Sequence, residues 1–184
     1  MRKVRFASAT IHTNRFLLRQ FCSGDLTFVF EGLSHPDVIL YYGVRYSSLE
    51  ETNEQLIWFN DLQKNETGIW WAICDKENLS LLGAIGFNDL SKTDQKAEIG
   101  FWLLPEHWGK GIIKEVANPV CNYAFEKLGL TKIEAVVETQ NENSKKVLQK
   151  LDFDYQKTME NCEIKNDELI SFAIYIKLKR EDIS

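Results

Sequence analysis

The chain has 184 residues, of which 44% are hydrophobic and 27% are charged, and its formal net charge is −5. This length and composition are typical of one soluble globular domain whose core is large enough to fold without metals or disulfides. The acidic balance argues against broad nucleic-acid binding, which requires a basic face. We therefore expect a single domain over residues 1–184 with no nucleic-acid partner.

The cysteines and the apolar runs narrow the class of protein further. The four cysteines lie far apart with no CxxC pair, and the histidines show no ligand spacing, so we expect no zinc or other metal site and no redox dithiol. The N-terminus MRKVRFASAT lacks the apolar stretch of a signal peptide, and no run approaches the roughly 18 apolar residues of a membrane span. These features predict a cytoplasmic protein with no membrane partner.

The first part of the chain is expected to hold one strand and two helices. NRFLLRQF is the candidate strand, although its periodicity alone does not exclude a short helix. SGDLTFVFEGLSHPDV is typical of a capped helix that starts near Ser23 or Asp25. In SSLEETNEQLIWFNDLQKN, Ser47 or Ser48 is the expected N-cap, with Glu51 as its capping-box partner.

Three strand candidates follow, IWWAICD, LSLLGAIGFND and KAEIGFWLL, and the first two can pair as a hairpin across the polar turn KENLS. The next segment, KGIIKEVANPVCNYAFEKLGL, places apolar residues on one helical face and stops at Gly129. Pro119 falls inside this helix, where it removes a backbone hydrogen bond at a cost of about 3 kcal/mol. We therefore predict a kink near Glu115 to Asn118, or a helix that starts late.

The last part of the chain is expected to hold three strands and one helix. KIEAVVET alternates like a strand, and NENSKKVLQKL is a short helix capped by Asn141 or Asn143. FDYQKTMENCEIKND and ELISFAIYIKLK are typical of two antiparallel strands joined by a polar turn. The order β-αα-βββ-α-β-α-ββ predicts an α/β (mixed α+β) domain around a central sheet.

Two glycines stand where the third central strand gives way to the long helix, in PEHWGKGIIKE. Glycine loses more freedom on folding than any other residue, so two of them at one junction need a reason. Backbone N–H groups around glycines, next to a helix N-terminus, can form a concavity that binds phosphate, and Lys110 and Lys114 add positive charge. A tight turn that lets strand and helix pack closely is an equally good explanation. The dinucleotide fingerprint GxGxxG is not met, and the P-loop pattern is absent.

Taken with its neighbours, this loop resembles that of the GNAT acetyltransferases, in the branch similar to the ribosomal-protein N-acetyltransferases. The similarity runs from TNRFLLR through LLGAIGF and AEIGFWLLPEHWGKG to NYAFEKLGLTKIEAVVETQNENSKKVLQKLDF, in the family's order and spacing. The resemblance implies a GNAT-like fold with a mostly antiparallel sheet. It also implies direct transfer of an acetyl group from acetyl-CoA, as co-substrate, to a primary amine of a protein N-terminus or a small molecule.

Carried over residue by residue, the resemblance implies three sets of contacts with acetyl-CoA. The backbone of Phe101, Trp102 and Leu103 would pair with the pantetheine as an extra strand. Asn141 would contact the pantetheine arm. The pyrophosphate would be surrounded by the N–H groups of Trp108, Gly109, Lys110, Gly111, Ile112, Ile113 and Lys114.

Three positions depart from the family's pattern. Glu106 stands where the family often has Arg or Gln, and because a diphosphate repels a carboxylate, we expect its side chain to point away. Asp152 stands in KLDF where glycine is usual, and Asp tolerates a positive φ less well than glycine does. Leu148 occupies the position of a tyrosine that many relatives use to protonate the leaving thiolate, and leucine cannot donate a proton.

Acetyl transfer to an amine needs a neutral amine and a protonated leaving thiol. Glu98 is the candidate base, because in AEIGFWLL it shares a strand face with Trp102, and a carboxylate in a partly desolvated cleft has a raised pKa. The alternative is a strand glutamate that reaches solvent or pairs with a lysine. Ser144 is the candidate acid, since the resembling branch has a serine near the sulfur. The alternative is a simple serine at a helix N-terminus.

The acceptor pocket is expected between the first two helices, their connecting loop and nearby strand ends. HPDVILYYGVRY offers Tyr41 and Tyr42, and IWW offers Trp70, although aromatic residues are more often core than pocket. Asn88 and Asp89 are further candidates for lining the cleft. Two other functions stay open: a non-catalytic acyl-CoA-binding module, and a structural domain in which the glycine loop is only a turn. Exposed aromatics and the last strands are candidates for a homodimer surface.

Overall fold

The structure, a computed structural model, describes residues 9–180. The strands are β1 (Ile11–His12), β2 (Phe16–Gln20), β3 (Ile69–Asp75), β4 (Leu81–Ser91), β5 (Lys96–Leu103), β6 (Lys132–Glu138), β7 (Asp154–Lys165) and β8 (Glu168–Leu178). The helices are α1 (Leu26–Ser34), α2 (Pro36–Ile39), α3 (Leu49–Lys64), α4 (Ile112–Glu126) and α5 (Glu142–Lys150), with short 3-10 turns at Ser23–Asp25 and Pro105–His107. The predicted order of elements is confirmed, with β1 and α2 as additional short elements.

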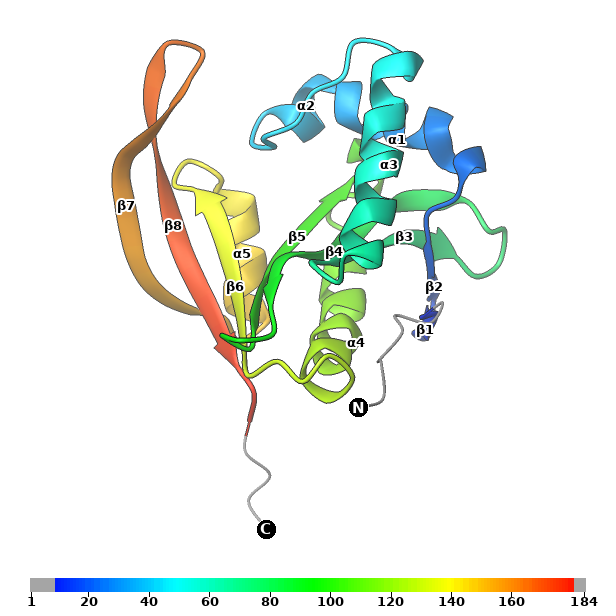
Figure 1. The fold of residues 1–184 in the computed structure, drawn as a ribbon. Coiled ribbons are helices and arrows are strands. Elements are labelled where there is room, and N and C mark those ends of the chain that lie inside the picture. Colours follow the sequence, from blue (N-terminus) through cyan, green and yellow to red (C-terminus); the bar gives the residue numbers. More distant parts are fainter. Residues whose placement is uncertain (1–8, 181–184) are drawn as a thin grey trace.

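One eight-stranded sheet runs through the domain in the order β1-β2-β3-β4-β5-β6-β8-β7 (Figure 1). Every neighbouring pair is antiparallel except β5 and β6, which are parallel. The α/β fold with a mostly antiparallel sheet is therefore confirmed. None of the helices within residues 9–180 has the length and apolar character needed to cross a bilayer.

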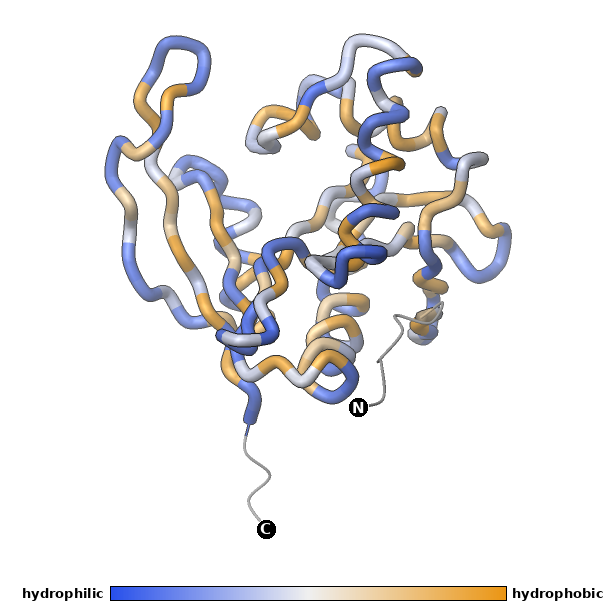
Figure 2. The backbone as a smooth tube through the Cα atoms, in the orientation of Figure 1, coloured by the Kyte–Doolittle hydropathy of each residue, from blue (hydrophilic) through white to orange (hydrophobic). Residues whose placement is uncertain are grey.

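The two faces of the sheet carry separate hydrophobic cores. On one face, α4 and α5 contribute Val116 and Leu148 to a cluster that includes Ile99 of β5. On the other face, α1 and α3 pack over the N-terminal half of the sheet, in a cluster that includes Trp102. Adjacent odd and even residues of β5 thus reach opposite cores, as the period-two pattern predicts. Figure 2 shows the complementary feature: the β3–β4 turn and the tip of the β7–β8 hairpin are hydrophilic, whereas α4 is mostly hydrophobic.

Capping side chains set the starts of two helices. The Ser48 hydroxyl oxygen accepts the N–H of Glu51 at 3.2 Å, and the Glu51 carboxylate accepts the N–H of Ser47 at 2.8 Å. At the start of α5, Oδ1 of Asn141 accepts the N–H of Ser144 at 3.1 Å. These bonds satisfy N–H groups that the helix itself leaves unpaired. Ser48 and Asn141 are confirmed as N-caps, whereas the Glu51 carboxylate bonds the N–H of Ser47 instead of that of the N-cap, and Asp25 at the N-cap of α1 makes no side-chain capping bond.

Pro119 lies inside α4, and the helix runs unbroken from Ile112 to Glu126 through it. The alternative that the helix starts late is wrong. Proline removes the bond to the carbonyl four residues earlier and crowds that carbonyl, but Val116 and Val120 on either side are fully buried in the core. Packing of α4 against the core therefore outweighs the local cost of proline, which was the reason to expect a late helix start.

The sheet is split between β5 and β6. Their parallel pairing joins Lys96–Glu98 to Lys132–Glu134 and then stops. From Ile99 onward, β5 has β4 on one side and no strand on the other among the described residues. Because parallel strands end on the same side, the loop before α4 and the start of α5 both lie at the open end of this split (Figure 1).

Candidate active site

The glycine loop before α4 leaves backbone N–H groups free at the start of the helix. Gly109 and Gly111 both have a φ of 73°, a conformation that costs other residues energy. Gly111 is the N-cap of α4, so the N–H groups of residues 112–114 have no intrahelical acceptor. Lys110 and Lys114 are exposed beside them. Backbone donors at a helix N-terminus with two lysines nearby suit an anion such as a diphosphate.

Trp108 anchors this loop to the end of β5 by a hydrogen bond. Its indole N–H donates to the Leu103 carbonyl at 2.9 Å, and its backbone N–H donates to the Pro105 carbonyl at 3.0 Å. The backbone donors of the loop that are left for a ligand therefore begin at Gly109. The Glu106 side chain is 60% exposed, and its carboxylate lies 3.9 Å from Nε2 of His107.

Glu98 lies at the last pair before the split. It stands opposite Asn88 of β4 and Glu134 of β6. Burial raises the pKa of Glu98 to about 7, the Asp89 carboxylate acts in the same direction, and a hydrogen bond from Asn88 opposes them. At neutral pH this carboxyl is therefore balanced between its two protonation states, which suits a general base.

Glu134, the neighbour of Glu98 on β6, is held in the opposite state. Burial raises its pKa, but the ammonium groups of Lys132 and Lys96, at 2.8 and 3.1 Å, outweigh burial and hold the pKa below its usual value. Within residues 9–180, Glu98 forms no such ion pair. The pKa values of these two adjacent carboxyls are driven apart, so Glu98 is the one suited to exchange a proton near neutral pH.

Two of the predicted acceptor residues lie on the Glu98 side of the sheet. Burial raises the pKa of Tyr42, and the charge of Glu98 adds to this effect, so the Tyr42 hydroxyl lies within electrostatic reach of Glu98. Trp70 crosses the strands beside it: a Cβ on Gly86 would meet its Cγ at 2.4 Å, and a Cβ on Gly100 would meet its Cη2 at 2.8 Å. The two glycines thus leave room for the Trp70 ring next to Glu98.

Tyr41 turns instead toward the β7–β8 hairpin. The ammonium of Lys165, at the end of β7, lies 5.8 Å from the centroid of the Tyr41 ring. The same ammonium hydrogen-bonds to the Leu40 carbonyl and forms an ion pair with the Glu138 carboxylate at the end of β6. We call Lys165, Leu40 and Glu138 the hairpin clasp. It ties the segment after α2 to the far half of the split sheet.

Ser144 lies at the opposite rim of the split, in the first turn of α5. Its hydroxyl has no hydrogen-bond partner among residues 9–180, and its side chain is half-buried. The capping bond to Ser144 uses Oδ1 of Asn141, so the Asn141 amide NH₂ remains available to a ligand. Leu148 is buried in the α4–α5 core.

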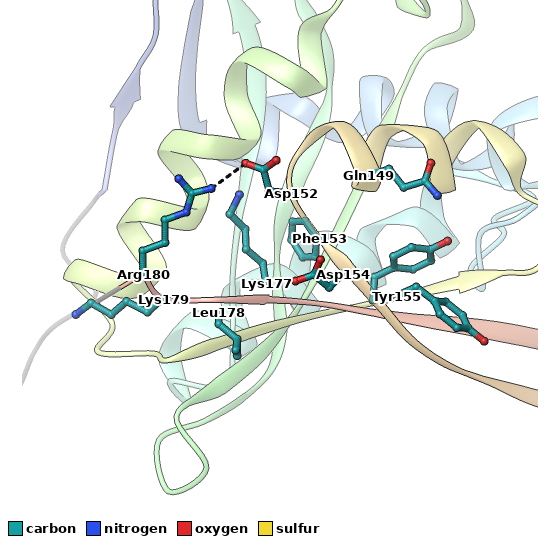
Figure 3. Close-up of a pocket in the computed structure, with 10 residues that line it drawn as sticks. Gln149, Asp152, Phe153, Asp154, Tyr155, Lys177, Leu178, Lys179 and Arg180 are labelled. Atoms are coloured by element: carbon teal, nitrogen blue, oxygen red, sulfur yellow. Dashed lines mark hydrogen bonds and ion pairs between the residues drawn. The ribbon is translucent and has the colours of Figure 1, made fainter. Parts of the chain in front are cut away.

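A hollow of about 660 Å³ lies elsewhere, where α5 ends and β7 begins (Figure 3). It is lined by Gln149, Asp152, Phe153, Asp154, Tyr155, Tyr175, Lys177, Leu178, Lys179 and Arg180. Asp152, where glycine is usual in the family, has a positive φ of 60°, and its carboxylate pairs with Arg180 at 3.2 Å. None of the predicted catalytic or ligand-binding residues lines this hollow, so its size does not make it the reaction site. Within residues 9–180, no group of three or more His, Cys, Asp or Glu side chains is arranged to hold a metal ion.

A split sheet that ends in a loop with free backbone donors, with a carboxyl of raised pKa at the split, suits an enzyme that moves a group from a diphosphate-bearing carrier. The chain belongs to the GNAT acetyltransferases, because the family model described as an acetyltransferase (GNAT) domain matches residues 15–154. YoaA of Bacillus subtilis (strain 168), an uncharacterised N-acetyltransferase, is 38% identical over 144 residues, which cover 78% of this chain and 81% of that protein.

Solved structures share the fold over nearly the whole chain. RimL, a ribosomal L7/L12 alpha-N-protein acetyltransferase in complex with coenzyme A, superposes with a TM-score of 0.84 at 17% identity and covers 92% of this chain and 98% of that one. Spermidine N-acetyltransferase from Vibrio cholerae, with CoA and spermine, gives 0.80 at 21% identity, with coverages of 89% and 95%. Family membership makes the protein an N-acetyltransferase that uses acetyl-CoA, which confirms the predicted class and co-substrate. The interpretation as a binding module without turnover is not favoured.

Proposed function

We propose that acetyl-CoA occupies the split between β5 and β6 and that the acceptor amine enters from the Glu98 side of the sheet. The observation that carries this proposal is the position of Glu98, whose pKa is raised to about 7 at the point where the two strands separate. The pantetheine would lie along residues 101–103 and against the Asn141 amide. The pyrophosphate would bind the N–H groups of residues 109–114.

The proposed reaction is a direct transfer. The neutral amine attacks the thioester carbonyl carbon, the C–N bond forms, and the C–S bond breaks. The proton lost by the amine passes to Glu98, directly or through one water, and the departing thiolate takes a proton from the Ser144 hydroxyl. Solvent water then returns a proton to the Ser144 oxygen and accepts the proton held by Glu98, so both groups are restored. Holding amine and thioester in register supplies about 7–11 kcal/mol of the barrier reduction. The position of Ser144 at the other rim of the split supports its separate role as acid.

The proposed acceptor is a protein N-terminal amine or a small amine, and Tyr42, Trp70 and Asn88 would line its path. Both acceptor classes are named among proteins of this fold, in RimL and in the spermidine enzyme. A base with a pKa near 7 can deprotonate an α-amine more easily than a lysine-like amine. With a pKa of about 8 it is roughly one-tenth neutral at pH 7, whereas deprotonating a lysine-like amine at that pH costs about 4.6 kcal/mol.

Free-thiol release from acetyl-CoA tests the proposal, measured with a panel of N-terminal peptides, polyamines and aminoglycosides. We expect turnover on one acceptor class, and a sharp decrease with the Glu98→Gln variant. Full activity of that variant would remove Glu98 from the mechanism. Binding of CoA without turnover on any of these acceptors would support the acyl-CoA-binding module instead.

A further inference from the structure

A cluster of hydrogen bonds joins the segment before β2 to the first turn of α4. The Glu115 carboxylate accepts from the Thr13 hydroxyl at 2.7 Å, from the Arg15 backbone N–H at 2.8 Å and from Arg15 Nε at 2.7 Å. Burial raises the pKa of Glu115, but these donors outweigh it and hold the pKa below its usual value. The Arg15 side chain is therefore fixed by an ionised carboxylate that belongs to the helix following the glycine loop.

From this anchor, Arg15 reaches the loop itself. Its Nη1 and Nη2 atoms both lie 3.3 Å from the carbonyl oxygen of Lys110. Nη2 is also 3.9 Å from the point where a Cβ on Gly111 would lie. The guanidinium thus holds the peptide between Lys110 and Gly111, in the middle of the loop.

The orientation of that peptide decides which of its groups a ligand would meet. A planar trans peptide points its C=O and its N–H in opposite directions. When Arg15 binds the Lys110 oxygen, the Gly111 N–H is directed away from Arg15. Glycines at positions 109 and 111 adopt either hand of the backbone with little cost. Without the guanidinium, the peptide can therefore rotate and present an oxygen, which repels a diphosphate.

We propose that Arg15 is a positioning residue for acetyl-CoA, which locks the Lys110–Gly111 peptide in the orientation that receives the pyrophosphate. This inference rests on the proposed function, since it concerns the same loop. Arg15 acts through the peptide and at a distance from the thioester. Its loss therefore weakens donor binding and leaves the chemical step unchanged.

The Arg15→Met variant tests this role, because methionine keeps an unbranched apolar side chain and removes the guanidinium, including its contact with the Phe16 ring. We expect the Kd for CoA and the KM for acetyl-CoA to rise about tenfold, the effect of losing one hydrogen bond to a charged group. The kcat should change less than twofold. Arg15→Lys, which restores the charge but not the two-nitrogen contact, should recover part of the affinity.

A truncated donor separates loop orientation from general damage. S-acetyl-pantetheine has no pyrophosphate, so its kcat/KM should be equal in wild type and Arg15→Met, while that of acetyl-CoA falls about tenfold. Arg180→Met is the matched control, since Arg180 also pairs with a carboxylate, that of Asp152, but lies two residues after the end of β8. It should behave as wild type with both donors.

Two results would overturn the inference. One is an unchanged Kd for CoA in Arg15→Met, and the other is an equal loss of kcat/KM with both donors, which would mean that Arg15 only supports the fold. Failure of the wild-type protein to bind CoA is a different outcome, because it would overturn the proposed function and this inference with it.

Discussion

Replacing Glu98 by Gln removes a charge while keeping the size of the side chain and an oxygen that can accept the bond from Asn88. Because the pKa of Glu98 is raised to about 7, the carboxylate is about one-tenth ionised at pH 6 and about nine-tenths ionised at pH 8. A general base typically contributes 10²–10⁴-fold to the rate. We therefore expect Glu98→Gln to lower kcat/KM at pH 8 by about 100-fold or more.

The same substitution should make the protein more stable. The folded-state pKa is raised from 4.5 to about 7, so the folded protein binds this proton more tightly than the unfolded chain does. Stability is then lost as the pH rises through the window between these two values, and the loss is complete above it. The glutamine side chain does not ionise, so the Glu98→Gln variant does not lose this stability as the pH rises. Allowing for screening of a half-buried group, the free energy of unfolding at pH 8 should rise by about 2 kcal/mol.

The assay is thiol release at saturating acetyl-CoA from pH 6 to 8, together with urea unfolding at pH 5 and pH 8. The pH profile of the variant reports ionisation of the acceptor alone, so the ratio of wild-type to variant activity isolates Glu98 and should rise about tenfold over this range. A ratio that does not change with pH would refute the assignment of Glu98 as base. Loss of both activity and stability would indicate damage to the fold instead.

Three further substitutions test other parts of the site. Ser144→Ala should lower kcat more than it raises the KM for acetyl-CoA, and an unchanged kcat in steady-state assays would remove Ser144 from the mechanism. Gly111→Ala places a side chain at a φ of 73°, so urea unfolding should show a loss of about 1–3 kcal/mol and titration should show weaker CoA binding; full stability would contradict the strain. Lys165→Met leaves the Glu138 carboxylate of the hairpin clasp buried without its partner, which should cost about 1–3 kcal/mol of unfolding free energy and raise the KM for the acceptor but not for acetyl-CoA. An unchanged acceptor KM would show that the clasp does not shape the acceptor path.

Local chemistry made much of the fold predictable. Ser48 and Asn141 begin their helices with side-chain bonds to residues three positions later, and such bonds can be read from adjacent letters. The alternation along β5 predicted that Glu98 and Trp102 share a face, because side chains in a strand alternate. Pro119 shows the limit of this reasoning, since local propensity cannot weigh the packing that keeps α4 continuous.

The contacts that orient the site could not be predicted in the same way. Arg15 and Glu115 are separated by 100 positions, and Lys165 and Leu40 by 125. No periodicity relates such residues, because only the sheet order brings their segments together. The pKa of Glu98 is raised mainly by burial and further by Asp89, which lies within an irregularity of the β4–β5 register and has a φ of 50°. A bulge of this kind re-aims side chains, and its placement is a tertiary property.

The split between β5 and β6 leaves backbone groups of Ile99–Leu103 without a strand partner on one side, within the part of the chain that is described. An open edge of this kind is where a further strand, including one from another molecule, can add. A pantetheine arm lying along this edge would bind the folded chain and not the unfolded one. Each tenfold rise of free acetyl-CoA above its Kd would then add about 1.4 kcal/mol to the free energy of unfolding. We therefore expect the supply of acetyl donor to govern how long the enzyme resists unfolding and self-association, as well as how fast it works.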